Sequence, residues 1–154
     1  AMGIIQIHTR DNGRPPMQWD DSKYAGFSAE DSAEPWIAVN GNHTKINAAD
    51  QLRDEDSIFR YYQKLIAMRK EMDVIAYGDI EPLAVKNSCV FAYRRTYEGH
   101  ELIVAANFYG REYTWKGAPD VDGYDRVIGN YKDAVSAEHG VMHLRPYEAA
   151  VWYK

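Results

Sequence analysis

The sequence is short of cysteine, of basic runs and of long apolar runs, and each shortage excludes a class of protein. Cys89 is the only cysteine in 154 residues, so no intramolecular disulfide is possible and a reducing, cytoplasmic environment is predicted. No stretch of about 20 apolar residues occurs, which predicts no membrane span. Acidic and basic residues are mixed along the chain with a net charge of −5, which disfavours nucleic-acid binding.

Motifs for cofactors and metals are also missing. No glycine-rich phosphate-binding motif occurs in the sequence. His139 and His143 have the four-residue spacing of a helical metal pair, but Gly140 lies between them in a segment typical of a turn and a strand. We therefore predict no cofactor and no metal ion.

The densest polar stretch runs from Arg10 to Asp20 and reads Arg-Asp-Asn-Gly-Arg-Pro-Pro-Met-Gln-Trp-Asp. Guanidinium groups hold carboxylates and vicinal sugar hydroxyls in a planar, bidentate way. The Asn-Gly pair favours a tight turn, and the Pro-Pro pair keeps the exit of the turn extended. The stretch predicts a stiff polar loop that holds a guanidinium in place, and a purely structural salt-bridge cluster is the alternative.

The clearest helix is predicted at 56–72. Asp54 or Asp56 is expected to cap its start, and Arg69 and Lys70 lie near its end, as the helix dipole prefers. At 100° per residue one half of the cylinder is apolar, and a face this wide predicts packing against two partners. The apolar residues of this half are Ile58, Phe59, Tyr61, Tyr62, Leu65, Ile66, Met68 and Met72.

After the helix the apolar period becomes two, and turn residues separate the apolar runs. Tyr97-Glu98-Gly99 predicts a hairpin turn, and regular short strands of this kind predict an antiparallel β-sandwich. The aromatic content of 13% fits such a core, and it equally fits proteins that stack aromatic rings on sugars. The expected strands are Cys89–Thr96, His100–Asn107, Glu112–Trp115, Tyr124–Ile128, Val141–Arg145 and Glu148–Tyr153.

The Arg10–Trp19 stretch resembles the Arg-Asp-Asn-Ala-Arg-Thr-Pro-Met-Gln-Trp motif of the α-glucosidases in glycoside hydrolase family 13. Gly13 and Pro15 depart from the motif, but neither departure affects Arg10. The resemblance continues to the C-terminus through short blocks in the family's order. These blocks are Ala25–Phe27, Pro35–Ile37, Val39–Asn40, Ile46–Asn47, Asp56–Phe59, Tyr77–Gly78, Phe91–Tyr93, Ala106–Phe108 and Leu144–Ala149.

The resemblance implies a mainly β fold class: an antiparallel C-terminal β-sandwich, preceded by one long amphipathic helix and a long irregular loop segment left from a (β/α)8 barrel. Residues 1–3 are expected to be a cloning scar on an excised fragment. Residues 4–55 resemble the late part of the connection between the eighth barrel strand and helix. Residues 56–72 resemble the last barrel helix, and 73–154 resemble the C-terminal β-sandwich domain.

The same resemblance implies a fragment of a cytoplasmic α-glucosidase that hydrolyses terminal α-glucosidic bonds, α-1,6 bonds above all, in short oligosaccharides. Retaining hydrolysis needs two carboxyl groups, which in the family come from barrel strands outside this chain. The chain alone is therefore expected to be inactive, and no catalytic residue is assigned in it. Arg10 matches the arginine that binds the non-reducing glucose, and it is the one substrate-binding residue predicted. The choice between isomalto-oligosaccharides and trehalose-6-phosphate stays open.

Two further expectations concern partners. Without the barrel, apolar surface would be left uncovered, so either self-association or a loop folded back over the helix is expected. The alternative function is a stand-alone carbohydrate-binding or structural β-module. Such a module needs exposed, coplanar aromatic side chains on one sandwich face, such as Tyr113, Trp115 and Trp152. The ordered series of family blocks favours the enzyme fragment, because a free module has no reason to keep it.

Overall fold

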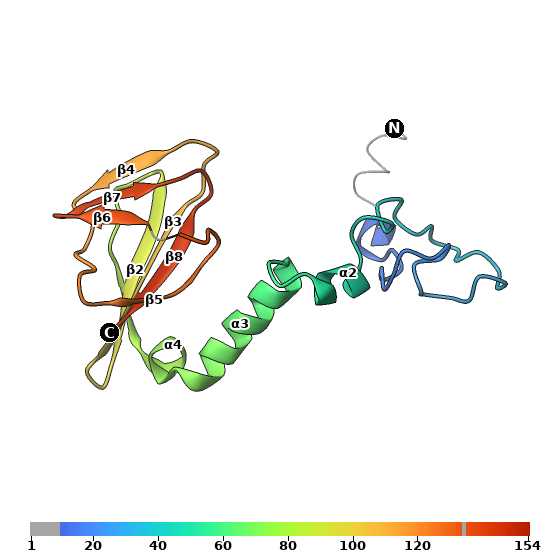
Figure 1. Cartoon of the computed structure of the whole chain (residues 1–154), viewed down its shortest axis with the longest axis horizontal. Helices are drawn as coiled ribbons and strands as arrows, with labels where there is room; N and C mark the ends of the chain where they lie inside the picture. The colour runs from blue at the N-terminus through green and yellow to red at the C-terminus, as the bar shows by residue number, and fades with distance from the viewer. Residues whose placement is uncertain (1–9, 134) are drawn as a thin grey trace. The chain divides into compact units, whose positions relative to one another are not determined.

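The computed structural model describes residues 10–133 and 135–154, without the side chains of Arg10, Asn12 and Ser136. The chain divides into two units, residues 1–67 and 68–154 (Figure 1). The expected cloning scar at 1–3 lies outside the described residues. Within the described ranges, no helix is both long and apolar enough to cross a membrane.

The first unit is largely irregular, as the sequence predicts, but it contains two short helical segments. A 3-10 helix, η1, spans Arg10–Gly13, and helix α2 spans Ala48–Arg53. Asn47 caps α2 because its side-chain oxygen accepts the backbone N–H of Asp50 at 2.9 Å. The expectation of an unbroken irregular segment up to residue 55 is therefore corrected at α2.

Helix α3 spans Ile58–Glu71, within two residues of the predicted bounds. The prediction that Asp54 or Asp56 caps it is wrong. The hydroxyl of Ser57 accepts the backbone N–H of Arg60 at 3.2 Å and donates to the carbonyl of Gln51 at 2.6 Å. None of the α3 side chains is buried, and Ile58 is 75% exposed. The apolar half of this helix is thus only partly covered within the described part of the chain.

The second unit contains helix α4 and two antiparallel sheets. The larger sheet has five strands in the order β1-β2-β3-β8-β5, and the smaller has three in the order β4-β7-β6. Every strand pair in both sheets is antiparallel. The elements are α4 Asp73–Tyr77, β1 Asp79–Pro82, β2 Val90–Tyr97, β3 His100–Asn107, β4 Tyr113–Lys116, β5 Asp125–Gly129, β6 Ser136–Glu138, β7 Val141–Leu144 and β8 Ala149–Tyr153.

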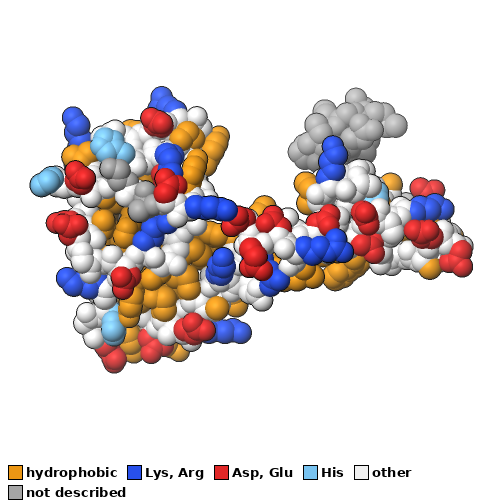
Figure 2. All heavy atoms as spheres, in the orientation of Figure 1, with side chains coloured by type: hydrophobic (Ala, Val, Ile, Leu, Met, Phe, Trp, Pro, Cys, Tyr) orange, Lys and Arg blue, Asp and Glu red, His pale blue; other side chains and the backbone are white. Residues whose placement is uncertain are grey.

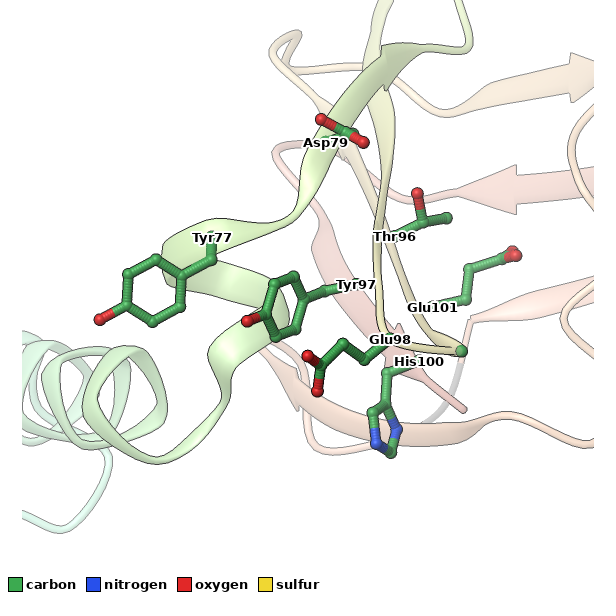
Figure 3. Close-up of a pocket in the computed structure, with 8 residues that line it drawn as sticks. Tyr77, Asp79, Thr96, Tyr97, Glu98, His100 and Glu101 are labelled. Carbon is green, nitrogen blue, oxygen red and sulfur yellow. The ribbon is translucent and has the colours of Figure 1, made fainter.

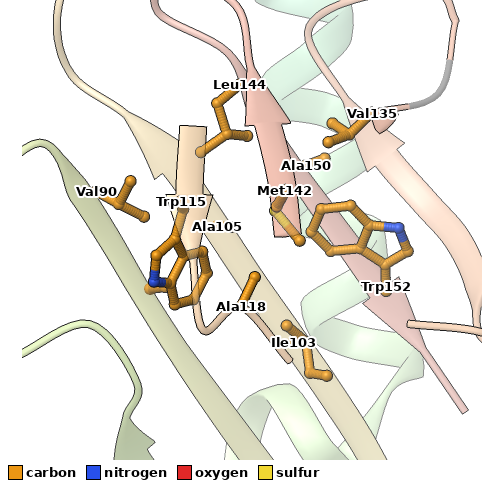
Figure 4. Close-up of a cluster of buried hydrophobic side chains, with 11 residues drawn as sticks. Val90, Ile103, Ala105, Trp115, Ala118, Val135, Met142, Leu144, Ala150 and Trp152 are labelled. Atoms are coloured by element: carbon orange, nitrogen blue, oxygen red, sulfur yellow. The ribbon is translucent and has the colours of Figure 1, made fainter. Parts of the chain in front are cut away.

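The core of this unit lies between side chains of the two sheets (Figure 4). Ile103 and Trp152 belong to the five-stranded sheet, and Trp115, Met142 and Leu144 belong to the three-stranded sheet. Each of these five side chains is at most 4% exposed. Burial of such side chains stabilises a fold by about 1.5–3 kcal/mol each, so this cluster is the main source of the unit's stability.

The six strands predicted from alternation are confirmed within one or two residues, as is the turn that contains Glu98 and Gly99. Three elements were not predicted. Strand β1 has no buried side chain and therefore no apolar alternation, and β6 is only three residues long. Helix α4 lies in the range 73–154 that was expected to hold strands alone.

A buried carboxylate joins the start of β8 to the end of β7. Glu148 is 1% exposed, and its side chain accepts the backbone N–H of Arg145 at 2.8 Å and the Nε of the same residue at 2.9 Å. Arg145 also contacts Asp133 through a terminal nitrogen at 2.7 Å, and its guanidinium lies 4.0 Å from the centre of the Tyr131 ring. This arginine therefore holds together the chain segments around β7 and β8.

Replacing Glu148 with glutamine is expected to lower the free energy of unfolding by about 2 kcal/mol. The substitution keeps the shape of the side chain but removes the negative charge that compensates Arg145. Urea unfolding followed by circular dichroism measures the change. The control E138Q, at an exposed glutamate, is expected to stay within about 0.5 kcal/mol. Equal effects of the two variants would contradict this role of the buried pair.

Candidate functional site

The candidate site is the loop that begins at η1. Arg14 and Asp11 form an ion pair at 2.7 Å, and the backbone N–H of Arg14 donates to the carbonyl of Asp11 at 3.0 Å. Both side chains are about half exposed, so the pair adds little to stability. It does engage the guanidinium of Arg14 inside the loop. The other arginine of the motif, Arg10, begins η1, and its side chain lies outside the described part of the structure.

Gln18 ties this loop to the segment before α2. Its side-chain amide donates to the side chain of Asn42 at 2.9 Å and to the carbonyl of Ile46 at 2.5 Å. The backbone carbonyl of Gln18 accepts the N–H of Ala48, and that of Trp19 accepts the N–H of Ala49, both at 2.9 Å. These bonds satisfy amide groups in the first turn of α2 that would otherwise have no partner. The motif is thereby anchored to a helix start.

Asp20 organises the turn that follows. Its carboxylate accepts the hydroxyl of Ser22 at 2.5 Å and the backbone N–H of Ser22 at 3.0 Å. The hydrogen bonds from Ser22 hold the pKa of Asp20 below its usual range. Gly26 lies against this carboxylate with φ +65°, and a Cβ there would lie 2.6 Å from an Asp20 oxygen. Only glycine fits this approach without displacing Asp20.

The chemistry of the loop is that of binding and support. The carboxylate of Asp20 is occupied by Ser22, and Asp11 is occupied by Arg14. Among the described residues, no group of three or more His, Cys, Asp or Glu side chains could hold a metal ion. What the loop supplies is a hydrogen-bonded backbone frame that begins at Arg10. The assignment of Arg10 to substrate binding stays a prediction.

The aromatic platform expected for a stand-alone binding module is not present where the sequence placed it. Trp115 and Trp152 are each 4% exposed and belong to the core, and Tyr113 packs against the same core. These three side chains therefore offer no coplanar surface to a sugar. In β4 the burial follows the alternation of the sequence, because Trp115 is buried between the exposed Thr114 and Lys116.

Two supporting residues of the loop were not singled out from the sequence, although local signals for them exist. Ser22 follows Asp20 by two positions, the spacing at which an aspartate side chain closes a turn. Asn47 precedes α2, with Asp50 three positions later, which is a cap pattern. The shortness of α2 hid this pattern, since six residues give too little apolar periodicity to detect.

Many known proteins are similar to this chain. Residues 2–78 match the family model described as the α-amylase catalytic domain. An oligo-1,6-glucosidase of Bacillus cereus is 42% identical over 99% of this chain, which covers 27% of that protein. A trehalose-6-phosphate hydrolase of Escherichia coli K12 is 36% identical over 98% of this chain, again covering 27% of that protein.

A solved structure is also similar to this chain over nearly its whole length. The crystal structure of a trehalose-6-phosphate hydrolase of Bacillus licheniformis matches 99% of this chain with a TM-score of 0.85 and 36% identity, and 27% of that protein is covered. The chain thus spans about a quarter of the length of these relatives. The match to the catalytic-domain model ends at residue 78, directly before strand β1.

Removing the hydroxyl of Ser22 is expected to raise the pKa of Asp20 toward its ordinary value. A carboxyl with a lowered pKa stabilises the folded state above its unfolded pKa of about 3.9. This contribution is lost as the pH falls through the lower, folded pKa. In S22A the folded pKa lies closer to the unfolded one, so this contribution is smaller and less stability is lost on acidification. An NMR titration of the Asp20 carboxyl measures the shift, with S32A as control. An unchanged Asp20 pKa in S22A would contradict the account.

Proposed function

Because this chain belongs to the α-amylase family, glycoside hydrolase family 13, we propose that it is the C-terminal part of an α-glucosidase. The enzyme hydrolyses terminal α-glucosidic bonds of short oligosaccharides, with α-1,6 bonds as its main target. The observation that carries this proposal is the family match over residues 2–78, which includes the whole Arg10–Asp20 loop. Oligo-1,6-glucosidases among the relatives support the choice of bond.

The proposed role of this chain in the reaction is to bind the sugar at the non-reducing end. The guanidinium of Arg10 donates to hydroxyls of the terminal glucose, for which a planar, fixed donor array is well suited. Two features support this role. The other motif arginine, Arg14, is engaged by Asp11, and Gln18 anchors the loop to α2. A guanidinium on such a frame is held in place before the substrate arrives.

The catalytic carboxyls are proposed to lie outside this chain. A retaining enzyme needs a nucleophile and an acid/base about 5–5.5 Å apart. Asp11 and Asp20 are engaged by Arg14 and Ser22, so neither is a suitable nucleophile. The chain alone is accordingly proposed to be inactive, and the complete enzyme is placed in the cytoplasm.

The proposed architecture follows the family. Residues 4–55 form the late part of the connection between the eighth strand and helix of a (β/α)8 barrel, and 56–72 form the last barrel helix. Residues 73–154 form a β-sandwich domain made of the two sheets. Exposed apolar side chains support this assignment, because residues built for a barrel interface lose their cover without it. Figure 2 shows such side chains at the surface of both units.

Hydrolysis of p-nitrophenyl α-glucoside tests the proposal that the catalytic carboxyls lie outside this chain. The purified chain is expected to show no turnover above buffer, because the pair of catalytic carboxyls is proposed to lie outside it. Turnover that persists through further purification steps would contradict the proposal. In that case D11N and D20N would identify which carboxylate is responsible.

The uncovered apolar surface predicts that the chain self-associates into a dimer or a larger species. The exposed residues Ile58, Tyr62 and Ile66 of α3 are the expected contact. Light scattering at several protein concentrations measures the mass, and I66E is expected to shift the species toward monomer. A clean monomer that binds no apolar dye would contradict the prediction.

A further inference from the structure

A hollow of about 610 Å³ lies at one end of the β2–β3 hairpin, and it has no part in the functions described above (Figure 3). Its volume is in the range of small-molecule sites. Tyr77, Asp79, Tyr97, Glu98 and His100 line it, together with short segments of the hairpin. All of these residues belong to the second unit, so the hollow is distinct from the Arg10 loop.

The placement of Tyr77 depends on a close contact between α4 and β2. The side chain of Arg95 donates to the carbonyl of Val74 at 3.0 Å and to that of Gly78 at 2.6 Å. The carbonyl of Val74 also accepts the backbone N–H of Gly78 at 3.2 Å, so Arg95 adds a second bond there and a bond to the carbonyl that follows α4. A Cβ at Gly78 would lie 2.5 Å from the carbonyl oxygen of Val74, so glycine permits this approach. Tyr77 is thereby held beside the hairpin.

Two tyrosine rings form one wall of the hollow. The ring centres of Tyr77 and Tyr97 are 5.9 Å apart and the planes are inclined by 42°, and Tyr77 is 69% exposed. An exposed tyrosine offers an apolar face and a polar hydroxyl. The negative charge of Glu98 raises the pKa of Tyr97.

The hairpin turn places the carboxylate of Glu98 beside these rings, and the backbone of this residue is strained. Glu98 and Gly99 form a two-residue turn with φ of +48° and +86°. Turns with two positive φ values favour Asn-Gly or Gly-Gly, so a glutamate at the first position is strained. In Figure 3 the carboxylate of Glu98 lies near the ring of Tyr97 and the ring of His100. The strained residue is therefore one that faces the hollow.

The carboxylates of the hollow differ in their availability. Glu101 is engaged by the hydroxyl of Tyr124 at 2.5 Å and by Arg94 at 2.9 Å. Among the described residues, the side-chain carboxylates of Glu98 and Asp79 have no hydrogen bond or ion pair. The Nδ1 of His100 bonds to the hydroxyl of Tyr153 at 2.7 Å, which fixes the imidazole ring and leaves Nε2 for another partner.

We propose that this hollow, the hairpin-end site, binds one pyranose unit of a neutral oligosaccharide. The C–H face of the sugar packs on Tyr77, and the carboxylate of Glu98 accepts hydrogen bonds from its hydroxyls. The ligand class rests on the proposed function, whereas the location and the contacts come from the hollow itself. The site would hold an oligosaccharide on the β-sheet unit.

The charges of the hollow select against phosphorylated sugars. Three of the residues that line it are acidic, and no lysine or arginine is among them. A phosphate would meet like charges without a compensating cation, which disfavours its binding. The hairpin-end site is therefore expected to accept isomaltose and to reject trehalose-6-phosphate.

Chemical-shift titration of the purified chain with isomaltose tests the proposal. The backbone amides of Tyr97, Gly99 and His100 are expected to shift, with saturation at millimolar sugar. Y77A is expected to weaken binding about tenfold, by loss of the stacking face. E98N is expected to weaken binding at least threefold while leaving Tm unchanged or higher, because asparagine suits the turn. The control Y62A, at an exposed tyrosine of the first unit, is expected to bind like the unmodified chain.

The remaining outcomes separate this site from the proposed function. Shifts lost in R10A but kept in Y77A would place the sugar at the Arg10 loop and overturn the hairpin-end site alone. Equal binding of trehalose-6-phosphate, or displacement of the sugar by tetramethylammonium at low concentration, would overturn the assignment to a neutral sugar. Absence of any chemical-shift change at a sugar concentration 50-fold above about 1 mM would also overturn it. None of these results depends on whether the chain hydrolyses a glucoside.

Discussion

In the second unit, side chains of two antiparallel sheets meet in a shared apolar core, and every other feature of that unit depends on this burial. Ile103 and Trp152 face Trp115 and Met142 across it, so neither sheet is stable without the other. The core fixes β2 and β3 in one register. The fixed hairpin in turn holds Arg95 where it can cap α4 and bring Tyr77 beside Tyr97.

The first unit is stabilised differently. Few of its side chains are buried, and its irregular backbone is organised by polar side chains that bond to backbone groups. Gln18, Asp20 and Asn47 each bond to at least one backbone group of the loop or of α2. Such bonds add about 1 kcal/mol each and specify a shape rather than a large stability. A loop of this kind is suited to the substrate-binding role that we propose for Arg10.

The sequence predicted most of the sheets because their strands alternate, and it predicted α3 because fourteen residues give a clear apolar face. It did not predict α2, α4, β1 or β6, which are short or lack buried positions, so periodicity carries no signal for them. The aromatic residues illustrate a second limit. Trp115 and Trp152 are core residues and Tyr77 is a surface residue, and only the fold distinguishes them. The hollow beside Tyr77 depends on the approach of α4 to β2, which no local pattern encodes.

A chimeric enzyme tests the central claim most directly. In it, this chain replaces the matching quarter of the oligo-1,6-glucosidase of Bacillus cereus. The measurement is kcat/KM for p-nitrophenyl α-glucoside in the chimera, in its R10A variant and in its R14A variant as control. We expect an active chimera whose kcat/KM falls about 10- to 100-fold in R10A and less in R14A. An active chimera in which R10A has no effect would contradict the claim that this loop binds the substrate.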